Sequence, residues 1–248
     1  MNRFLVLLTR AGEMLIFLFH TFYWMKSAFK MKKETFNQIY RMGIGSLPVV
    51  SLMAIFSGMV LALQTGHELL KIQATQALGA IVAATLTREL GPVLTGLIVA
   101  GRVGASMTAE LGTMKVSEEI DALKAMAINP IRFLVVPRMI SSLLIMPILT
   151  VYTNVTGIMG GFLIGRVQLN VRFYPYLEGI AKFVTLKDIG NGLVKALVFG
   201  LIIGLVSCFE GFHTEGGARG VGEATTRAVV ISFLLILMAD YVVTHLLY

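Results

Sequence analysis

Long apolar stretches separated by shorter polar segments dominate this chain of 248 residues. A helix that crosses the hydrocarbon core of a bilayer needs about 20 consecutive, mostly apolar residues. Four stretches approach this requirement clearly and a fifth follows them: 47–63, 78–101, 139–165, 192–209 and 228–247. The pattern predicts an all-α integral membrane protein with about five transmembrane helices.

The stretch 3–24 has an amphipathic pattern instead. Its polar side chains share one arc, about 100° wide, of a helical wheel: Arg3, Arg10, Glu13 and His20. Such a helix lies in the membrane interface better than it crosses the bilayer, although the sequence leaves a spanning arrangement open. A cytoplasmic collar of lysines follows: Lys26, Lys30, Lys32 and Lys33. We therefore divide the chain into an interfacial helix with its basic collar, 1–45, and a transmembrane domain, 46–248.

The charge pattern also favours a membrane protein. Only 14% of the residues are charged and the mean hydropathy is +0.80, whereas a soluble domain needs a more charged surface. The net charge of +7 does not indicate nucleic acid binding, because the basic residues flank the apolar stretches. With the N-terminus inside, fourteen Lys and Arg residues are cytoplasmic and six lie on the other side. This count favours a cytoplasmic N-terminus.

The sequence carries no motif for covalent chemistry. It has no GxxxxGK[ST] phosphate loop, and its four histidines are scattered without metal-ligand spacing. The single cysteine, Cys208, cannot form a disulfide within one chain. We predict a subunit that is not an enzyme and holds no metal.

The most informative polar segment is 101–137, between the second and third predicted spans. Ser117 can cap a short helix, and acidic residues near its start complement the positive end of the helix dipole: Glu118, Glu119 and Asp121. The Asn-Pro pair at 129–130 is expected to stop this helix. A capped acidic helix on the cytoplasmic face suits docking into a groove of a soluble partner. An ordinary solvated loop helix is the alternative.

Charged residues inside a bilayer are costly, so each requires a reason. Arg88 and Glu89 fall in the second predicted span, just before a Gly-Pro break that can bend the helix. They line a functional cavity or form part of a charge network with Lys195 and Asp240; the alternative is a structural ion pair near a helix end. Asp240 can pair with Arg227 or with Lys195, and the sequence does not decide.

Two long motifs resemble those of a known family. The run LTRELGPVLTGLIVAGRVGASMTAELGTMKVSEEIDALKAMAINP at 86–130 and the run GVGEATTRAVV at 220–230 are similar to the MlaE/YrbE-type permeases of the Mla and Mce lipid-transport systems. The resemblance extends from about residue 40 to the end of the chain. It implies the permease subunit of an ABC transporter, which moves phospholipid between a bacterial inner membrane and a periplasmic Mce-domain protein.

The resemblance also implies partners. The family forms homodimers, each bound by two ATPase subunits on the cytoplasmic face. ATP and Mg would then be bound by the ATPase, and this chain would hold no cofactor. An Mce-domain (MlaD-like) hexamer would sit on the periplasmic face, and in some systems a STAS-domain (MlaB-like) protein binds the ATPase. No nucleic acid is among these partners.

Site residues follow by position from the same resemblance. Segment 117–127 maps onto the coupling helix that enters the ATPase, with these candidate residues: Ser117, Glu118, Glu119, Asp121, Ala122 and Leu123. The phospholipid cavity would lie at the dimer interface, between the first and last spans of both copies, with Leu61, Gln64 and Leu69 lining it. The charged candidates of the cavity or its network are Arg88, Glu89, Lys195, Arg227 and Asp240.

Two other function classes remain open. An ion-coupled secondary carrier would use the intramembrane charges as a relay, but such carriers often contain inverted repeats and this sequence shows no convincing repeat. A non-transporting membrane scaffold for an Mce-like protein would have little need of charges within its spans.

Overall fold

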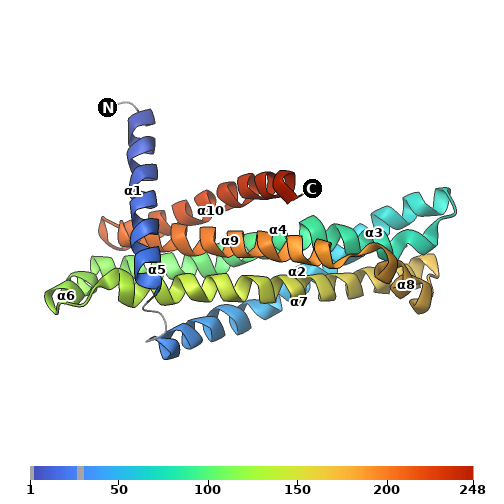
Figure 1. Ribbon diagram of the computed structural model, residues 1–248, viewed down its shortest axis with the longest axis horizontal. Coiled ribbons are helices and arrows are strands. Elements are labelled where there is room, and N and C mark those ends of the chain that lie inside the picture. The colour runs from blue at the N-terminus through green and yellow to red at the C-terminus, as the bar shows by residue number, and fades with distance from the viewer. Residues whose placement is uncertain (1–2, 27–30, 248) are drawn as a thin grey trace. The chain divides into compact units, whose positions relative to one another are not determined.

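A computed structural model describes residues 3–26 and 31–247, and within these ranges every regular element is helical and no strand occurs (Figure 1). Lys30 of the basic collar lies outside the described residues. The α-helices are α1 (Arg3–Met25), α2 (Lys32–Lys71), α3 (Leu78–Thr85), α4 (Gly91–Val99), α5 (Ala105–Val116), α6 (Glu119–Ala125), α7 (Val136–Leu169), α8 (Phe173–Phe183), α9 (Leu186–Phe212) and α10 (Gly217–Leu247).

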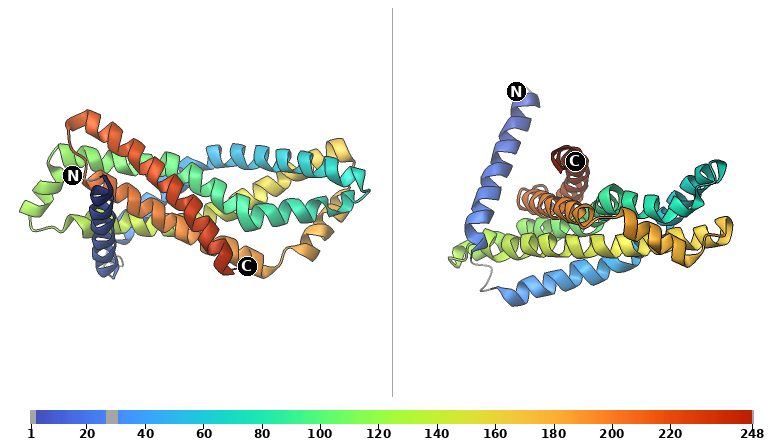
Figure 2. Two further views of the ribbon diagram at one scale, coloured as in Figure 1. Left: turned by 90° about the horizontal axis from the view of Figure 1, so that it is seen from above. Right: turned by 45° about the vertical axis from the view of Figure 1, so that its right-hand side comes forward.

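Five helical segments of the described chain are long and apolar enough to cross a membrane, which confirms the predicted fold class. All five extend beyond the predicted spans: Lys32–Lys71, Thr75–Val116, Ile131–Leu169, Leu186–Phe212 and Gly217–Leu247. Helices α2, α9 and α10 can each be followed as one ribbon in Figure 2. The length of a helix beyond the bilayer is not visible in hydropathy, because polar residues continue a helix as readily as apolar ones.

The second span contains two π-helical turns and continues further than the apolar pattern indicated. It runs from Thr75 to Val116, so the segment after Gly101 begins as helix and not as a loop. In the turn Leu86–Leu90, the N–H of Gly91 donates to the carbonyl oxygen of Leu86, five residues earlier. The Gly-Pro pair is thus accommodated by a π turn inside a continuous helix, a feature that often marks functional sites.

Helix α1 does not belong to the five candidate spans. Its buried Phe17 packs edge-to-face against Phe209 and Phe212 at the end of α9, with ring centroids 5.8 and 5.7 Å apart. Other apolar side chains of α1 are exposed, including Phe19 and Tyr23. This arrangement agrees with an amphipathic helix, and its position in the membrane interface stays a prediction.

The chain divides into two compact units, and α2, α7, α9 and α10 contribute residues to both. Unit 1 comprises Met1–Ile44, Val99–Ile145 and Gly200–Leu235. Unit 2 comprises Gly45–Ile98, Met146–Phe199 and Ile236–Tyr248.

Unit 2 is held together by close contact between small residues. A Cβ added to Gly58 of α2 would lie 1.9 Å from the carbonyl oxygen of Gly157 in α7, and one added to Gly160 would lie 2.4 Å from that of Ile55. The backbones of α2 and α7 can approach this closely only because no side chain intervenes. Gly157 and Gly160 of α7 therefore pack within one chain.

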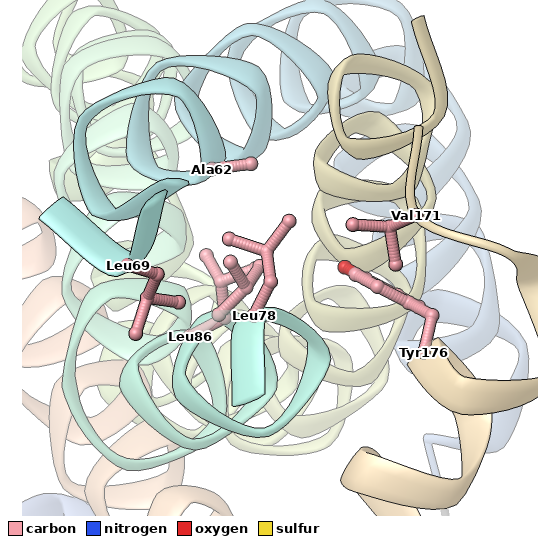
Figure 3. Close-up of a cluster of buried hydrophobic side chains, with 7 residues drawn as sticks. Ala62, Leu69, Leu78, Leu86, Val171 and Tyr176 are labelled. Atoms are coloured by element: carbon pink, nitrogen blue, oxygen red, sulfur yellow. The ribbon is translucent and has the colours of Figure 1, made fainter. Parts of the chain in front are cut away.

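A cluster of buried apolar side chains stabilises another part of unit 2. Side chains of α2, of the second span, and of α8 with the residues before it converge in Figure 3: Ala62, Leu69, Leu78, Leu86, Val171 and Tyr176. Val82 belongs to the same cluster. The phenol of Tyr176 donates a hydrogen bond to the carbonyl oxygen of Ile158 (3.0 Å), and burial raises the pKa of this phenol. The cluster fixes α8 against the second span.

Unit 1 combines close packing with an ion pair. Gly204 of α9 lies against Met139 and Ser142 of α7, where an added Cβ would lie 2.5 Å from Oγ of Ser142 and 2.7 Å from Sδ of Met139. Arg138, which is almost completely buried, reaches Glu110 of α5 at 3.1 Å. These contacts join the ends of three spans within this unit.

Candidate functional site

One ammonium group and two carboxylates meet within unit 2. Lys195 of α9 is fully buried, and its Nζ contacts a carboxylate oxygen of Glu89 from the π turn of the second span. The same Nζ lies 3.0 Å from Oδ1 of Asp240 on α10. The hydroxyl of Thr244 lies 3.5 Å from both carboxylate oxygens of Glu89. We call Glu89, Lys195, Asp240 and Thr244 the charge cluster.

The charge cluster joins three of the predicted site residues and decides the pairing of Asp240. Asp240 pairs with Lys195, which is one of the two alternatives that the sequence left open. A buried ammonium is tolerated because two carboxylates surround it, whereas an unpaired one would cost several kcal/mol. The side chains of Glu89 and Asp240 are 38% and 21% exposed, so the carboxylates connect the buried lysine with the surface of the chain.

Arg88 does not join the charge cluster, which corrects that part of the expected network. Its Nε lies 2.8 Å from Oδ1 of Asp188, near the start of α9. Neighbouring residues of a helix point about 100° apart, so Arg88 and Glu89 face different partners. Asp188 also accepts hydrogen bonds from the N–H and hydroxyl of Thr185, at 2.9 and 2.8 Å. Thr185 and Asp188 thus form a capping box at the start of α9.

Arg227 pairs with a residue that the sequence analysis missed. Its Nε lies 3.1 Å from Oε2 of Glu210, a carboxylate of α9 that is almost completely buried. Both residues belong to unit 1. Of the two alternatives for Asp240, the ion pair that the structure contains is the one with Lys195. Glu210 lies in an apolar stretch, and its charge there was the available signal.

The three candidate cavity residues of α2 differ in their surroundings. Leu69 is buried in the apolar cluster of unit 2, and Leu61 packs against that cluster. Gln64 is exposed. A role of these residues in a lipid cavity stays a prediction, and Gln64 is the one whose side chain is free to contact a ligand or a second copy.

The short helix expected in segment 117–127 is present as α6, but its start differs from the prediction. Ser117 ends α5, and its hydroxyl lies 2.9 Å from the carbonyl oxygen of Thr113 and 3.0 Å from Oε1 of Glu119. The residue before α6 is Glu118, which adopts a left-handed conformation with φ of 61°. The predicted Ser117 cap of α6 is wrong, because the sharp turn between α5 and α6 places Ser117 at the C-terminal cap of α5.

The end of α6 also has a different cause from the one predicted. Ala127 adopts a left-handed conformation with φ of 58°, and the N–H of Ile128 donates to the carbonyl oxygen of Leu123 (2.9 Å). This is a Schellman motif with alanine at the position that glycine usually occupies. The side chain of Asn129 accepts from the N–H of Ile131 (3.0 Å). The Asn-Pro pair at 129–130 therefore begins the third span and does not stop α6.

The surface of α6 combines charge with exposed apolar side chains. Lys124 and Lys115 donate to the carboxylate of Asp121, at 2.7 and 3.0 Å, and these hydrogen bonds hold its pKa below its usual value. Ala122 is exposed, and Leu123 is half-buried. The exposed apolar residues on or next to this helix went unnoticed in the sequence: Val116, Met126 and Ile128. An exposed apolar surface of this kind is typical of a protein interaction site.

Comparison with known proteins identifies the family. Residues 35–246 match the family described as Permease MlaE. The chain belongs to the MlaE permease family. The chain is 48% identical over 212 residues to a probable ABC transporter permease protein of Rickettsia typhi, with 86% of this chain and 82% of the relative covered. A probable ABC transporter permease protein of Synechocystis is 40% identical over 217 residues, covering 88% and 82% of the two chains.

A plant relative extends the same comparison. The protein TRIGALACTOSYLDIACYLGLYCEROL 1, chloroplastic, of Arabidopsis thaliana is 37% identical over 212 residues, or 86% of this chain and 61% of the relative. Membership of the MlaE permease family makes this chain a multi-pass membrane permease of an ABC transporter, and such a transporter implies an ATPase partner. The division of the chain at residue 45 stays a prediction.

Proposed function

We propose that this MlaE-family permease moves phospholipids between a bacterial inner membrane and a periplasmic Mce-domain protein, driven by ATP hydrolysis on its partner ATPase. The observation that carries the proposal is the family membership, together with the diacylglycerol lipid in the name of the Arabidopsis relative. The charge cluster within the spans supports transport over a scaffold role, because a scaffold has little need of costly intramembrane charges.

Coupling to the ATPase is assigned to α6. The sequence has no phosphate-loop motif, so ATP and Mg would be bound by the partner, and this chain would be a non-catalytic subunit without a cofactor. Helix α6 is short, closed at its end by a Schellman motif and fixed by the ion pairs of Asp121. A rigid element with exposed Met126 and Ile128 can enter a groove and transmit a displacement into the adjoining spans.

The permease is proposed to act as a homodimer with the N-terminus in the cytoplasm. Rows of exposed apolar side chains along α2 and α10 support a lipid-holding cavity or a subunit interface on these helices: Leu52, Phe56 and Val60, and Leu234, Met238 and Tyr241. A periplasmic Mce-domain hexamer would receive or deliver the lipid, and a STAS-domain protein would bind the ATPase. Gln64, Glu89 and Asp240 are proposed to face the lipid cavity.

The test is purification of the complex from its host in mild detergent, followed by mass spectrometry of proteins and lipids. We expect a P-loop ATPase, an Mce-domain protein and bound phospholipid. Glu119→Arg on α6 is expected to release the ATPase and leave membrane insertion intact. Glu178→Arg on α8 is the matched control, since Glu178 is also an exposed acid and should retain the ATPase.

Three results would contradict the proposal. Retention of the ATPase by Glu119→Arg and by a deletion of residues 118–123 would exclude α6 as the coupling element. Lipid or ion transport that continues in vesicles without any ATPase would favour the secondary carrier. A complex that binds the Mce-domain protein but never transfers phospholipid would favour the scaffold role.

A further inference from the structure

An apolar groove of about 560 Å³ opens on the surface of unit 1, between the first turns of α2 and the first turns of α7. Its walls are two helical stripes, one with Phe36 and Ile39 and the other with Ile140, Leu143 and Leu144. Met25 at the end of α1 contributes as well. Phe36 is 68% exposed and Leu144 is 51% exposed, so large apolar surfaces face outward here.

A basic residue also lines the groove. Lys32, the first residue of α2, lines the groove next to Thr35. Lys33 is its neighbour and Lys26 follows the end of α1, and all three lysines are exposed. Among residues 3–26 and 31–247, no salt bridge engages these three ammonium groups. The groove thus offers an apolar channel with unneutralised positive charge at its mouth.

A phospholipid with an acidic headgroup matches this arrangement better than another protein surface does. An acyl chain can fill the stripe between Phe36 and Leu144, while the phosphate of the headgroup contacts Lys32. A second copy of this chain on the same face would bring like-charged lysines together, which is unfavourable. Lysines at the end of a transmembrane helix are moreover the usual recognition element for anionic lipids.

We propose that the groove between α2 and α7 is a binding site for an acidic phospholipid of the surrounding bilayer, with Lys32 at its headgroup and Phe36 and Leu144 along an acyl chain. The occupant is a bound lipid of the leaflet that contacts the lysine collar. The proposal depends only on insertion of the five spans in a bilayer, and it holds whatever the permease transports.

Tryptophan quenching by brominated lipids tests the proposal directly. The chain has one tryptophan, Trp24, which Trp24→Phe removes while keeping an aromatic ring below Arg132. In that background, Phe36→Trp reports contact with acyl chains that carry bromine. The full chain is reconstituted in phosphatidylcholine vesicles that contain either brominated phosphatidylglycerol or brominated phosphatidylcholine.

We expect brominated phosphatidylglycerol to quench Phe36→Trp at a several-fold lower mole fraction than brominated phosphatidylcholine. Adding Lys32→Glu should reduce this preference about fivefold or more, because each cation near an anionic lipid surface adds roughly 1 kcal/mol. Ile148→Trp is the matched control. Ile148 is 59% exposed and lies one turn beyond Leu144 on the same face of α7, away from the groove, so both lipids should quench it equally.

Three outcomes would overturn the proposal. Equal quenching of Phe36→Trp by both lipids would show a groove without headgroup preference. Absence of quenching by either lipid would show that protein covers the groove, as a second copy of the chain would. An unchanged preference for brominated phosphatidylglycerol after Lys32→Glu would show that Lys32 does not bind the headgroup. If Phe36→Trp fails to insert, Leu144→Trp reports on the opposite wall and is subject to the same criteria.

Discussion

The ammonium nitrogen of Lys195 lies 3.0 Å from Oδ1 of Asp240, and the side chain of Lys195 is completely buried. Glu89, in the π turn Leu86–Leu90 of the second span, contacts the same nitrogen. One buried cation therefore joins α9 to α10 and to the π turn of the second span. Removal of the cation and removal of one anion should have unequal consequences.

Lys195→Met is expected to destabilise the protein by about 3 kcal/mol or more, because two carboxylates would be left without their cation. Asp240→Asn should cost less, since Glu89 still neutralises Lys195. Thermal unfolding of the purified protein in one detergent measures both. Lys187→Met is the control, because Lys187 is exposed on the same helix. A melting temperature of Lys195→Met equal to that of the control would contradict a structural role of the cluster.

The close approach of α2 and α7 in unit 2 gives a second prediction. Gly58→Ala would place a Cβ 1.9 Å from the Gly157 carbonyl oxygen, so the backbones must separate. We expect a loss of about 3 kcal/mol, at the upper end of typical overpacking costs. Gly190→Ala is the matched control, because an added Cβ there meets no atom within 4 Å. Its higher helix propensity should leave stability unchanged or slightly increased.

The same thermal unfolding assay measures both alanine variants. A stable Gly58→Ala protein that unfolds with the control would show that the α2–α7 contact is loose. That result would also make Gly157 and Gly160 of α7 candidates for contact with a second copy of the chain.

The left-handed conformation of Ala127 at the end of α6 gives a third prediction. Glycine substitutions at two nearby positions should change the stability of this helix in opposite directions. Ala127→Gly should stabilise the end of α6 by about 1 kcal/mol, because glycine adopts positive φ without steric cost. Ala122→Gly, in the middle of the same helix, should destabilise it by about 1 kcal/mol. Hydrogen exchange of the Ile128 amide, which is bonded to Leu123, should slow in the first variant and accelerate in the second. Equal changes in both would contradict the Schellman motif.

How much the sequence could reveal differs between the spans and the site. The five spans follow from hydropathy, because the bilayer imposes one length and one polarity on every crossing helix. The charged residues Glu89, Lys195 and Asp240 also stand out, since charge within an apolar run is rare. Their pairing could not be predicted, because it depends on which helix faces lie opposite each other.

The corrected details are local and have physical causes. Arg88 turned away from Glu89 because adjacent residues of a helix diverge, and its partner Asp188 was detectable as part of the Thr-x-x-Asp capping box. The start of α6 was not detectable, since Glu118 adopts a conformation that non-glycine residues rarely take. The preference of serine for helix starts therefore made Ser117 the predicted cap of α6, whereas it lies at the end of α5.

The predicted orientation can be tested with single cysteines, because the native Cys208 is fully buried and should react poorly with maleimides. Lys124→Cys on α6 and Lys182→Cys on α8 replace side chains that are 58% and 67% exposed. Only the third span separates the two positions, so an impermeant maleimide should label them from opposite sides. With a cytoplasmic N-terminus, position 182 reacts in intact spheroplasts and position 124 only in inverted vesicles. Reversed labelling would contradict the orientation, whereas labelling of both from one side would contradict α7 as a span.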